Sequence, residues 1–254
     1  MSSDPPPKLT DFRYMIFDVY GTLADWESGL YNALQPLLSG FSSASKWSRD
    51  DAIRTFLSVE GDIQAQHPTM LYSDLLAKAH ELLEARESSA SGSTPPADNK
   101  HTIFGKSIRK WEPFSDSAKA LKELSEHFHL IVLSNVDHAS FAYTHSYLSE
   151  GTFPSAATDD IQQASPLYRS KDATMPVTPP TLEEIKAKTL SVAQSLTHDH
   201  RPAKELGITS VWIDRQSASW RPIPPDNGSG YGWSWRFESL RELAQAVTDD
   251  IEDQ

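Results

Sequence analysis

The chain has 254 residues, of which 38% are hydrophobic and 10% aromatic, a composition that supports a folded core and excludes global disorder. Acidic residues outnumber basic residues 35 to 23, and the net charge of −12 argues against binding to nucleic acid or to an anionic membrane surface. Cysteine is absent, which excludes disulfide bonds, thiol catalysis and cysteine-ligated metal centres.

The sequence also lacks targeting and spanning segments. No apolar run approaches the ~18 residues of a membrane span. The N-terminus has no basic region followed by an apolar stretch, so it does not match a secretory signal. We therefore expect a cytoplasmic protein.

Four short apolar runs predict the buried strands of a parallel sheet. They cover residues 14–17, 130–133, 190–193 and 210–213, and polar residues follow each run. Because ligands of parallel sheets bind beyond the carboxyl ends of the strands, the residues that follow these runs are the first candidates for chemistry.

Helical patterns alternate with these strands. Apolar residues recur at three-to-four spacing over 118–128, with Ser115 or Asp116 as the N-cap. Residues 203–206 predict a short helix closed by Gly207, and 237–247 predict a final amphipathic helix. The alternation predicts an α/β fold of βαβ units.

A long insertion separates the first two strands. Residues 25–110 read as helical and predict a cap, whereas residues 9–24 and 111–254 supply the core. Within the cap, residues 87–99 are of low complexity and predict a disordered loop. Residues 165–180 contain four prolines and no periodicity, so they scarcely supply the crossover helix expected there.

The segment Phe17-Asp18-Val19-Tyr20-Gly21-Thr22-Leu23 carries the strongest chemical signal. Asp18 ends a strand, Gly21 permits a sharp turn, and the hydroxyl of Thr22 can donate to the carboxylate, which is how a nucleophilic aspartate is built. An isolated aspartate would more simply end a strand or cap a turn, and the residues that follow favour the nucleophile.

Two further strand ends carry polar residues. Ser134 and Asn135 follow the second strand and supply two short donors. Asp199 follows the third strand and precedes a helix, where it could act in catalysis or only as an N-cap. His198 and His200 flank Asp199, but neighbouring side chains point in different directions in a regular conformation, so we predict no metal site.

These three segments, in this order, resemble the haloacid dehalogenase superfamily and, more narrowly, its type II branch of (S)-2-haloacid dehalogenase-like proteins. The resemblance rests on DVYGTL with Trp26-Glu27, on Trp111-Glu112-Pro113-Phe114, and on the blocks LSNVD, AQSLTHDHRPA and VWIDR. It implies a Rossmann-like parallel sheet core with an inserted helical cap. It also implies that Asp18 is the nucleophile, that Thr22, Ser134 and Asn135 position it, and that Asp199 assists hydrolysis.

The identity of the residue two positions after Asp18 distinguishes the branches of this superfamily. Phosphatase members have a second aspartate there that protonates the leaving group, and such a general acid contributes about 10² to 10⁴-fold. This chain has Tyr20, and a halide leaving group needs no proton. The resemblance therefore implies a dehalogenase that displaces halide from a small 2-halo acid through an ester intermediate, without a metal or other cofactor.

Two roles remain to be assigned, namely the cation beside the nucleophile and the residues that bind the substrate. The resemblance calls for a lysine in a Tyr-Lys-Pro segment, and here Leu167-Tyr168-Arg169-Ser170-Lys171 offers Lys171, or Arg169, as the cation beside the nucleophile. Tyr20, Trp26 and Arg54 are the predicted substrate-binding residues, with Arg49 as the alternative to Arg54.

Two other functions stay open. One is a Mg²⁺-dependent phosphatase acting on a small metabolite, and Mg²⁺ is expected only in that case. The other is a catalytically impaired member that acts as a binding protein, which the missing Tyr-Lys-Pro segment favours. A small-molecule substrate is the expected partner, and the chain could form a homodimer.

Overall fold

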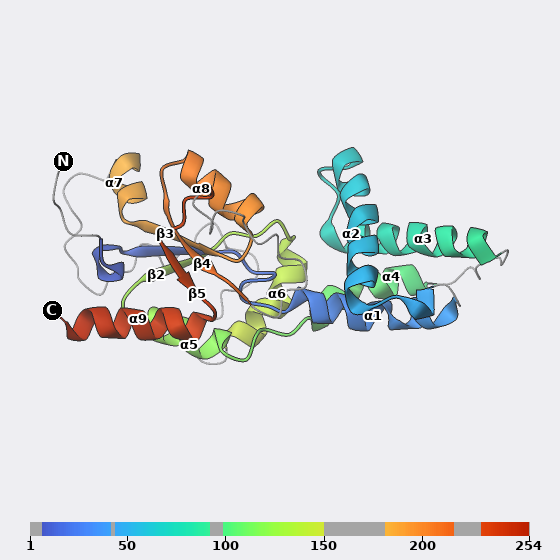
Figure 1. Ribbon diagram of the computed structural model, residues 1–254, viewed down its shortest axis with the longest axis horizontal. Helices are drawn as coiled ribbons and strands as arrows, with labels where there is room; N and C mark the ends of the chain where they lie inside the picture. The colour runs from blue at the N-terminus through green and yellow to red at the C-terminus, as the bar shows by residue number, and fades with distance from the viewer. Residues whose placement is uncertain (1–6, 42–43, 92–98, 150–180, 216–229, 254) are drawn as a thin grey trace.

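The computed structural model describes residues 7–41, 44–91, 99–149, 181–215 and 230–253, which form an α/β core beside a group of helices (Figure 1). The core holds a five-stranded parallel sheet in the order β2-β1-β3-β4-β5. The strands are β1 Tyr14–Phe17, β2 His129–Val132, β3 Thr189–Ala193, β4 Thr209–Ile213 and β5 Trp235–Phe237. The predicted parallel sheet is confirmed, and β1 to β4 begin and end within one residue of the predicted runs.

The register of the sheet decides which residues meet beyond its carboxyl edge. Phe17, the last residue of β1, pairs with Val132 of β2 on one side and with Val192 of β3 on the other. Val192 in turn pairs with Val211 of β4. The residues that follow β1, β2, β3 and β4 therefore emerge at the same edge.

Helices cover both faces of the sheet. In Figure 1, α5 (Ser117–Leu124) and α9 (Leu240–Glu252) lie on one side of it, and α7 (Leu182–Ala187) and α8 (Arg201–Glu205) lie on the other. Leu240, Leu243 and Val247 of α9 are almost fully buried in the core beneath the sheet, as the predicted stripe requires. Burial of each such side chain contributes about 1.5–3 kcal/mol relative to leaving it exposed.

Most of the described residues from 26 to 110 are helical. They form α1 (Trp26–Gly40), α2 (Arg49–Gln66), α3 (Tyr72–Ser91) and α4 (Lys100–Gly105), which stand beside the core in Figure 1. This helical insertion has its own cluster of buried side chains, including Leu34, Phe56 and Leu76. The division of the chain at residues 24/25 and 110/111 stays a prediction.

The predicted loop at residues 87–99 is wrong at its start. Helix α3 continues through Ser91, and the hydroxyl of Ser89 donates to the carbonyl of Ala85 at 2.8 Å in the manner of a helical serine. Residues 92–98 lie outside the described residues, and Asn99 is the N-cap of α4. Low complexity did not end the helix because the apolar stripe of α3 anchors the preceding turns.

Two helix ends also differ from the predictions. Helix α5 ends at Leu124 rather than 128, and the last helix starts at Leu240 because residues 235–237 form β5. Asp116 does not cap α5 with its side chain; its carboxylate accepts the N–H groups of Leu240 and Arg241 at 2.9 and 3.3 Å. It thus satisfies the first turn of α9, a partner that the local sequence pattern does not reveal.

Helix α6 (His138–Leu148) was not predicted at all. It packs against α5 and against the segment Lys106–Lys110, so its apolar residues form no single stripe. The sequence feature that could have indicated this helix is its N-cap, where the Asp137 carboxylate accepts from the N–H of Ser140 at 2.9 Å.

Residues 165–180, which were predicted to lack the crossover helix, lie outside the described residues. Within the described part of the chain, no helix is both long and apolar enough to cross a membrane.

Candidate active site

The loop after β1 is tightly folded around one carbonyl group. The carbonyl of Val19 accepts from the N–H groups of Leu23 and Ala24 at 2.7 and 2.9 Å. Gly21 has a φ of +103°, a backbone conformation that side-chain-bearing residues rarely adopt. A Cβ atom at Gly21 would also lie 3.2 Å from the indole nitrogen of Trp26. Glycine is therefore required for both the turn and the approach of the indole ring.

Thr22 fixes one oxygen of the Asp18 carboxylate. Its hydroxyl donates to Oδ2 of Asp18 at 2.7 Å and accepts from the N–H of Gln194 at 2.9 Å. Because the N–H group can only donate, the hydroxyl proton is committed to the carboxylate. Thr22 is fully buried, so this hydrogen bond is shielded from water. The predicted interaction of Thr22 with Asp18 is present.

Asp18 and Asp199 lie near enough to influence each other. Burial first, and the charge of Asp199 second, raise the pKa of Asp18 to about 7, against the opposing effect of the hydrogen bond from Thr22. Asp199 lies in the helical turn Leu196–His200, directly after β3. Burial raises the pKa of Asp199 to about 6, and the charge of His198 opposes that rise. The site therefore has two carboxyl groups that lose their protons near neutral pH.

Ser134 and Asn135 follow β2 at the same edge but are held more loosely. Ser134 is partly exposed, Asn135 is exposed, and the Ser134 hydroxyl accepts from the N–H of Val136 at 3.4 Å. The backbone beside them is fixed, since the N–H of Leu133 donates to the carbonyl of Phe17 at 2.9 Å. The hydrogen bonds of the described residues include none from Ser134 or Asn135 to Asp18.

The hydroxyl group of Tyr20 is placed and protonated in a way that does not suit a general acid. Its hydroxyl shares a hydrogen bond of 2.9 Å with the hydroxyl of Thr144 on α6, and its ring meets Trp111 edge to face at 5.7 Å. Burial raises the pKa of Tyr20 to about 12, so the phenol keeps its proton at neutral pH. Trp26, the first residue of α1, lies over Gly21. Both predicted substrate-binding aromatic residues therefore flank the Asp18 loop.

Of the four cations that the sequence suggested for the site, the structure describes only Arg49 and Arg54. Lys171 and its alternative Arg169 lie outside the described residues. Arg54 is exposed on α2, where its charge acts on Asp51. Arg49 instead reaches the start of α1, 3.1 Å from the hydroxyl of Ser28 and 3.8 Å from Glu27. In the described part of the chain, the groups that shift the pKa of Asp18 most are Asp199, Thr22 and the backbone of Val19, and none of them is a lysine or arginine.

Several residues at the site were missed from the sequence. Gln194 follows β3 and donates its backbone N–H to Thr22; Arg215 follows β4 by two residues and donates to the Thr22 carbonyl at 2.9 Å. The rule that selected Asp18 and Asp199, polar residues just beyond a strand, would have selected both. Thr144 lies on the unpredicted helix α6 and could not be found in this way.

The two histidines beside Asp199 have separate surroundings. His200 is fully buried, with Nε2 2.9 Å from the carbonyl of Ala193 and Nδ1 2.9 Å from the hydroxyl of Ser210. Since a carbonyl only accepts, Nε2 carries the proton and the ring holds β3 to β4. His198 is exposed. Among the described residues, no three His, Asp or Glu side chains gather in a way that could hold a metal ion.

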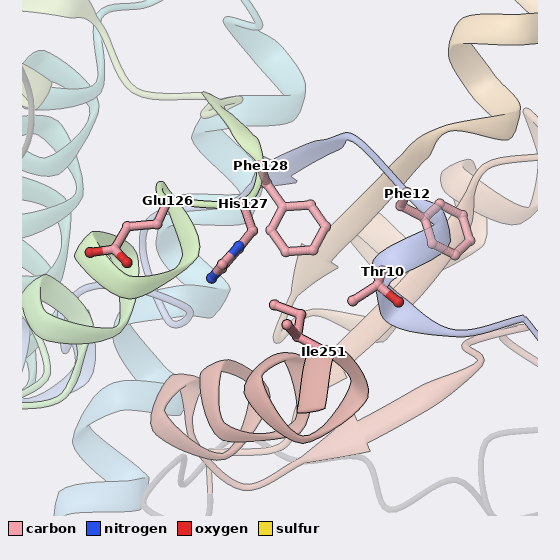
Figure 2. Close-up of a pocket in the computed structure, with 6 residues that line it drawn as sticks. All are labelled: Thr10, Phe12, Glu126, His127, Phe128 and Ile251. Atoms are coloured by element: carbon pink, nitrogen blue, oxygen red, sulfur yellow. The ribbon is translucent and has the colours of Figure 1, made fainter. Parts of the chain in front are cut away.

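A separate hollow lies at the opposite end of the strands. It has a volume of about 320 Å³ and is open to solvent (Figure 2). Its lining comes from the segments that precede β1 and β2 and from the end of α9, namely Thr10, Phe12, Glu126, His127, Phe128 and Ile251. It therefore has no part in the chemistry of Asp18.

Comparison with known proteins supports the fold at low sequence identity. No family model and no curated protein matches the chain. The L-2-haloacid dehalogenase PA0810 superposes with a TM-score of 0.60 and 16% identity, covering 93% of this chain and 99% of its own. The L-2-haloacid dehalogenase from Xanthobacter autotrophicus gives 0.58 and 15%, covering 93% and 98%.

A third solved structure is the putative HAD-hydrolase YfnB from Bacillus subtilis, whose crystals contain magnesium. It gives a TM-score of 0.57 and 13% identity, covering 93% of this chain and 99% of its own. The chain thus has the haloacid dehalogenase fold, and that fold is shared by proteins described as dehalogenases and by a putative hydrolase.

Proposed function

We propose that the chain is a hydrolase of the haloacid dehalogenase superfamily, type II branch, that releases halide from a small 2-halo acid. The observation that carries the proposal is the hydrogen bond from the Thr22 hydroxyl to the Asp18 carboxylate at the end of β1. Asp199, which follows the neighbouring strand β3, lies close enough to raise the pKa of Asp18. Tyr20, where a phosphatase would need an acid, is held by Thr144 and keeps its proton. The likeness in fold to L-2-haloacid dehalogenases agrees with this assignment.

In the first step, an oxygen of ionised Asp18 attacks C2 of the substrate. The new C–O bond forms as the carbon–halogen bond breaks, and the halide leaves with the bonding electron pair. The product is an ester that joins the Asp18 carboxyl group to C2 of the acid, and no proton transfer is needed. Because Thr22 donates to Oδ2, the other oxygen of Asp18 is the one free to attack.

In the second step, water hydrolyses that ester. Asp199 accepts a proton as water attacks the carbonyl carbon of the Asp18 ester. Collapse of the tetrahedral species breaks the bond to the C2 oxygen, which takes the proton back from Asp199 and leaves as the 2-hydroxy acid. The Asp18 carboxyl then loses its proton to solvent, which restores the nucleophile. A general base works best when its pKa lies near the working pH, and the pKa of Asp199 is about 6. Ser134 and Asn135 are proposed to position the reacting groups from the β2 side.

The substrate carboxylate needs a cation, and two arginines compete for that role. Arg49 extends from α2 to the start of α1, next to the loop that carries Asp18 and Trp26. Arg54 lies on the exposed part of α2 beside Asp51. We therefore favour Arg49 over Arg54 as the group that binds the carboxylate. Lys171 remains the proposed cation for the nucleophile itself.

A phosphatase is the second candidate function. It is favoured by the shared fold with the putative hydrolase whose crystals contain magnesium, and it is opposed by Tyr20. A member that binds without turnover is the third, and it is favoured by the lack of a Tyr-Lys-Pro segment in the sequence. Each alternative predicts a different response to Mg²⁺ and to substitution of Asp18.

The experiment uses both enantiomers of 2-chloropropionate and p-nitrophenyl phosphate, each with Mg²⁺ and with EDTA, and Asp18→Asn as the control. We expect halide release that persists in EDTA and is lost in Asp18→Asn. In a single turnover in ¹⁸O-water, the heavy oxygen should enter the Asp18 carboxylate, as mass spectrometry of its peptide would reveal. Phosphate release that depends on Mg²⁺, or no turnover of any substrate, would replace the proposal with one of its alternatives.

A further inference from the structure

Arg215 is a buried cation that touches the loop of the proposed nucleophile from behind. It follows β4 by two residues, and only 6% of its surface is exposed. Its Nε and Nη2 donate to the carbonyl of Thr22 at 3.2 and 2.9 Å, and its guanidinium lies 4.1 Å from the ring centre of Phe114. The same residue, Thr22, donates its hydroxyl to Asp18.

The other side of the guanidinium is bound by Asp116. Nη1 of Arg215 donates to both carboxylate oxygens of Asp116, at 2.8 and 3.0 Å. That carboxylate is 8% exposed and also accepts the N–H groups of Leu240 and Arg241 in the first turn of α9. The two charges are thus paired and hydrogen-bonded, as buried charges must be. Arg215 thereby connects the loop after β1 to α5 and α9.

We propose that Arg215 is a positioning residue for the Asp18 nucleophile. Its guanidinium holds the Thr22 carbonyl against a rigid support made by Asp116 and α9, while the backbone N–H of Gln194 orients the Thr22 hydroxyl. Held at both ends, Thr22 presents its proton to Oδ2 of Asp18 and leaves the second oxygen aimed at the substrate. The inference rests on the proposed function only in taking Asp18 as the nucleophile.

The residue type follows from this geometry. One planar guanidinium donates to a carbonyl along one edge and to a carboxylate along another, which a lysine ammonium on a flexible stem cannot reproduce. Arg215→Lys therefore keeps the charge beside Asp116 but releases the Thr22 carbonyl. Misplacement of a reacting group by about 1 Å costs on the order of 10²-fold in rate.

A matched control exists one strand away. Arg236 of β5 forms an ion pair with buried Asp214 at the end of β4, and its guanidinium lies over the ring of Trp212. It is the same kind of contact, an arginine on a buried aspartate and an aromatic ring, but its hydrogen bonds go to Asp214 rather than to Thr22. Because the side chain of Arg236 is more exposed than that of Arg215, Arg236→Lys controls for the loss of an arginine–aspartate contact at the edge of the sheet.

The test measures Arg215→Lys, Arg236→Lys and Thr22→Val in two ways, each normalised to the folded fraction. The first is kcat and KM for halide release. The second needs no turnover: the pH dependence of carbodiimide labelling of Asp18, read by mass spectrometry of its peptide. For Arg215→Lys we expect kcat to fall about 10²-fold with KM little changed. We also expect labelling to extend to higher pH, as in Thr22→Val, because the hydrogen bond that favours the ionised carboxylate is lost.

The outcomes separate the two proposals. Wild-type kcat and labelling in folded Arg215→Lys, or an equal response in Arg236→Lys, would overturn the positioning role. A shifted labelling profile in a protein whose wild type releases no halide would support the role of Arg215 and reject only the dehalogenase. If Arg215→Lys does not fold, Asp116→Asn serves instead, since it keeps an acceptor for α9 while loosening the guanidinium; it must shift labelling in the same direction by a smaller amount.

Discussion

The two sides of the Asp18 loop are built very differently. Towards β3 and β4, the loop is fixed by buried hydrogen bonds from Gln194 and Arg215 to Thr22. Towards β2, Ser134 and Asn135 are more exposed, and the hydroxyl of Ser134 contacts its own neighbour Val136. The difference separates two tasks. The rigid side sets the orientation and the proton affinity of the carboxylate, and the open side leaves room for the groups that must meet it.

The largest effect is expected for Asp18→Asn. An amide retains the size of the carboxylate and can still accept from Thr22, but it cannot form the ester. We expect halide release to fall on the order of 10⁴-fold or more, as for removal of an essential nucleophile. Halide electrode measurements on protein with unchanged circular dichroism would check this. Substantial residual turnover would show that a different group attacks the substrate.

Thr22→Val should have the next largest effect and should exceed Ser134→Ala. Valine matches the shape of threonine but leaves the N–H of Gln194 without its acceptor inside the core, which costs about 1–3 kcal/mol of unfolding free energy. It also removes the hydrogen bond that favours ionised Asp18, so kcat should fall and the pH at half-maximal rate should rise.

Ser134→Ala provides the comparison from the open side. Its hydroxyl is partly exposed, so we expect a change in unfolding free energy within about 0.5 kcal/mol. Chemical denaturation and pH–rate profiles of the two variants would check both expectations. An Asp18 whose pH profile responds to Ser134→Ala as strongly as to Thr22→Val would contradict the division into a rigid and an open side.

Sequence reasoning found the elements whose signals are local. The strands are short apolar runs followed by polar residues, and Asp18, Thr22 and Asp199 are among the polar residues that follow them. The search for such runs therefore located both the sheet and the two carboxylates. Sequence reasoning missed the interactions that depend on partners distant in the chain. The bond between Thr22 and Arg215 joins residues 193 positions apart, and Asp116 satisfies a helix more than 120 positions further along. Helix α6 was missed because contact on more than one side removes the single apolar stripe.

The pH dependence of the rate tests whether Lys171 is the cation beside Asp18. Both carboxylates must be ionised for the two steps, so the rate should rise with pH through about 6 to 7 if burial and the described neighbours set their pKa values. If Lys171 lies beside Asp18, the midpoint should instead fall clearly below 7, because a nearby cation favours the ionised form. Lys171→Ala should then return it towards 7, whereas Arg169→Ala should not. Equal midpoints in all three proteins would reject Lys171.

The stability of the folded protein should fall as the pH rises, in contrast to the rate. Folding raises the pKa of Asp18 and Asp199 above 3.8, so the folded state holds protons that the unfolded chain releases. The contribution of these groups is complete below the ordinary aspartate pKa and is lost as the pH rises to about 7. Thermal melts of wild type and Asp18→Asn at acidic and neutral pH should show the variant gaining relative stability as the pH rises.

The last prediction concerns the arginine that binds the substrate carboxylate. Arg49 approaches the start of α1 beside the Asp18 loop, so Arg49→Ala should raise KM about 10-fold or more, the value of one charge-assisted hydrogen bond of about 1.5–3 kcal/mol, and leave kcat less affected. Arg54→Ala should leave both constants unchanged because Arg54 is exposed beside Asp51. Steady-state kinetics with 2-chloropropionate and its uncharged amide distinguish them, since only the acid should be sensitive to Arg49. If Arg54→Ala raises KM for the acid and Arg49→Ala does not, the substrate carboxylate binds at the exposed part of α2 rather than at the start of α1.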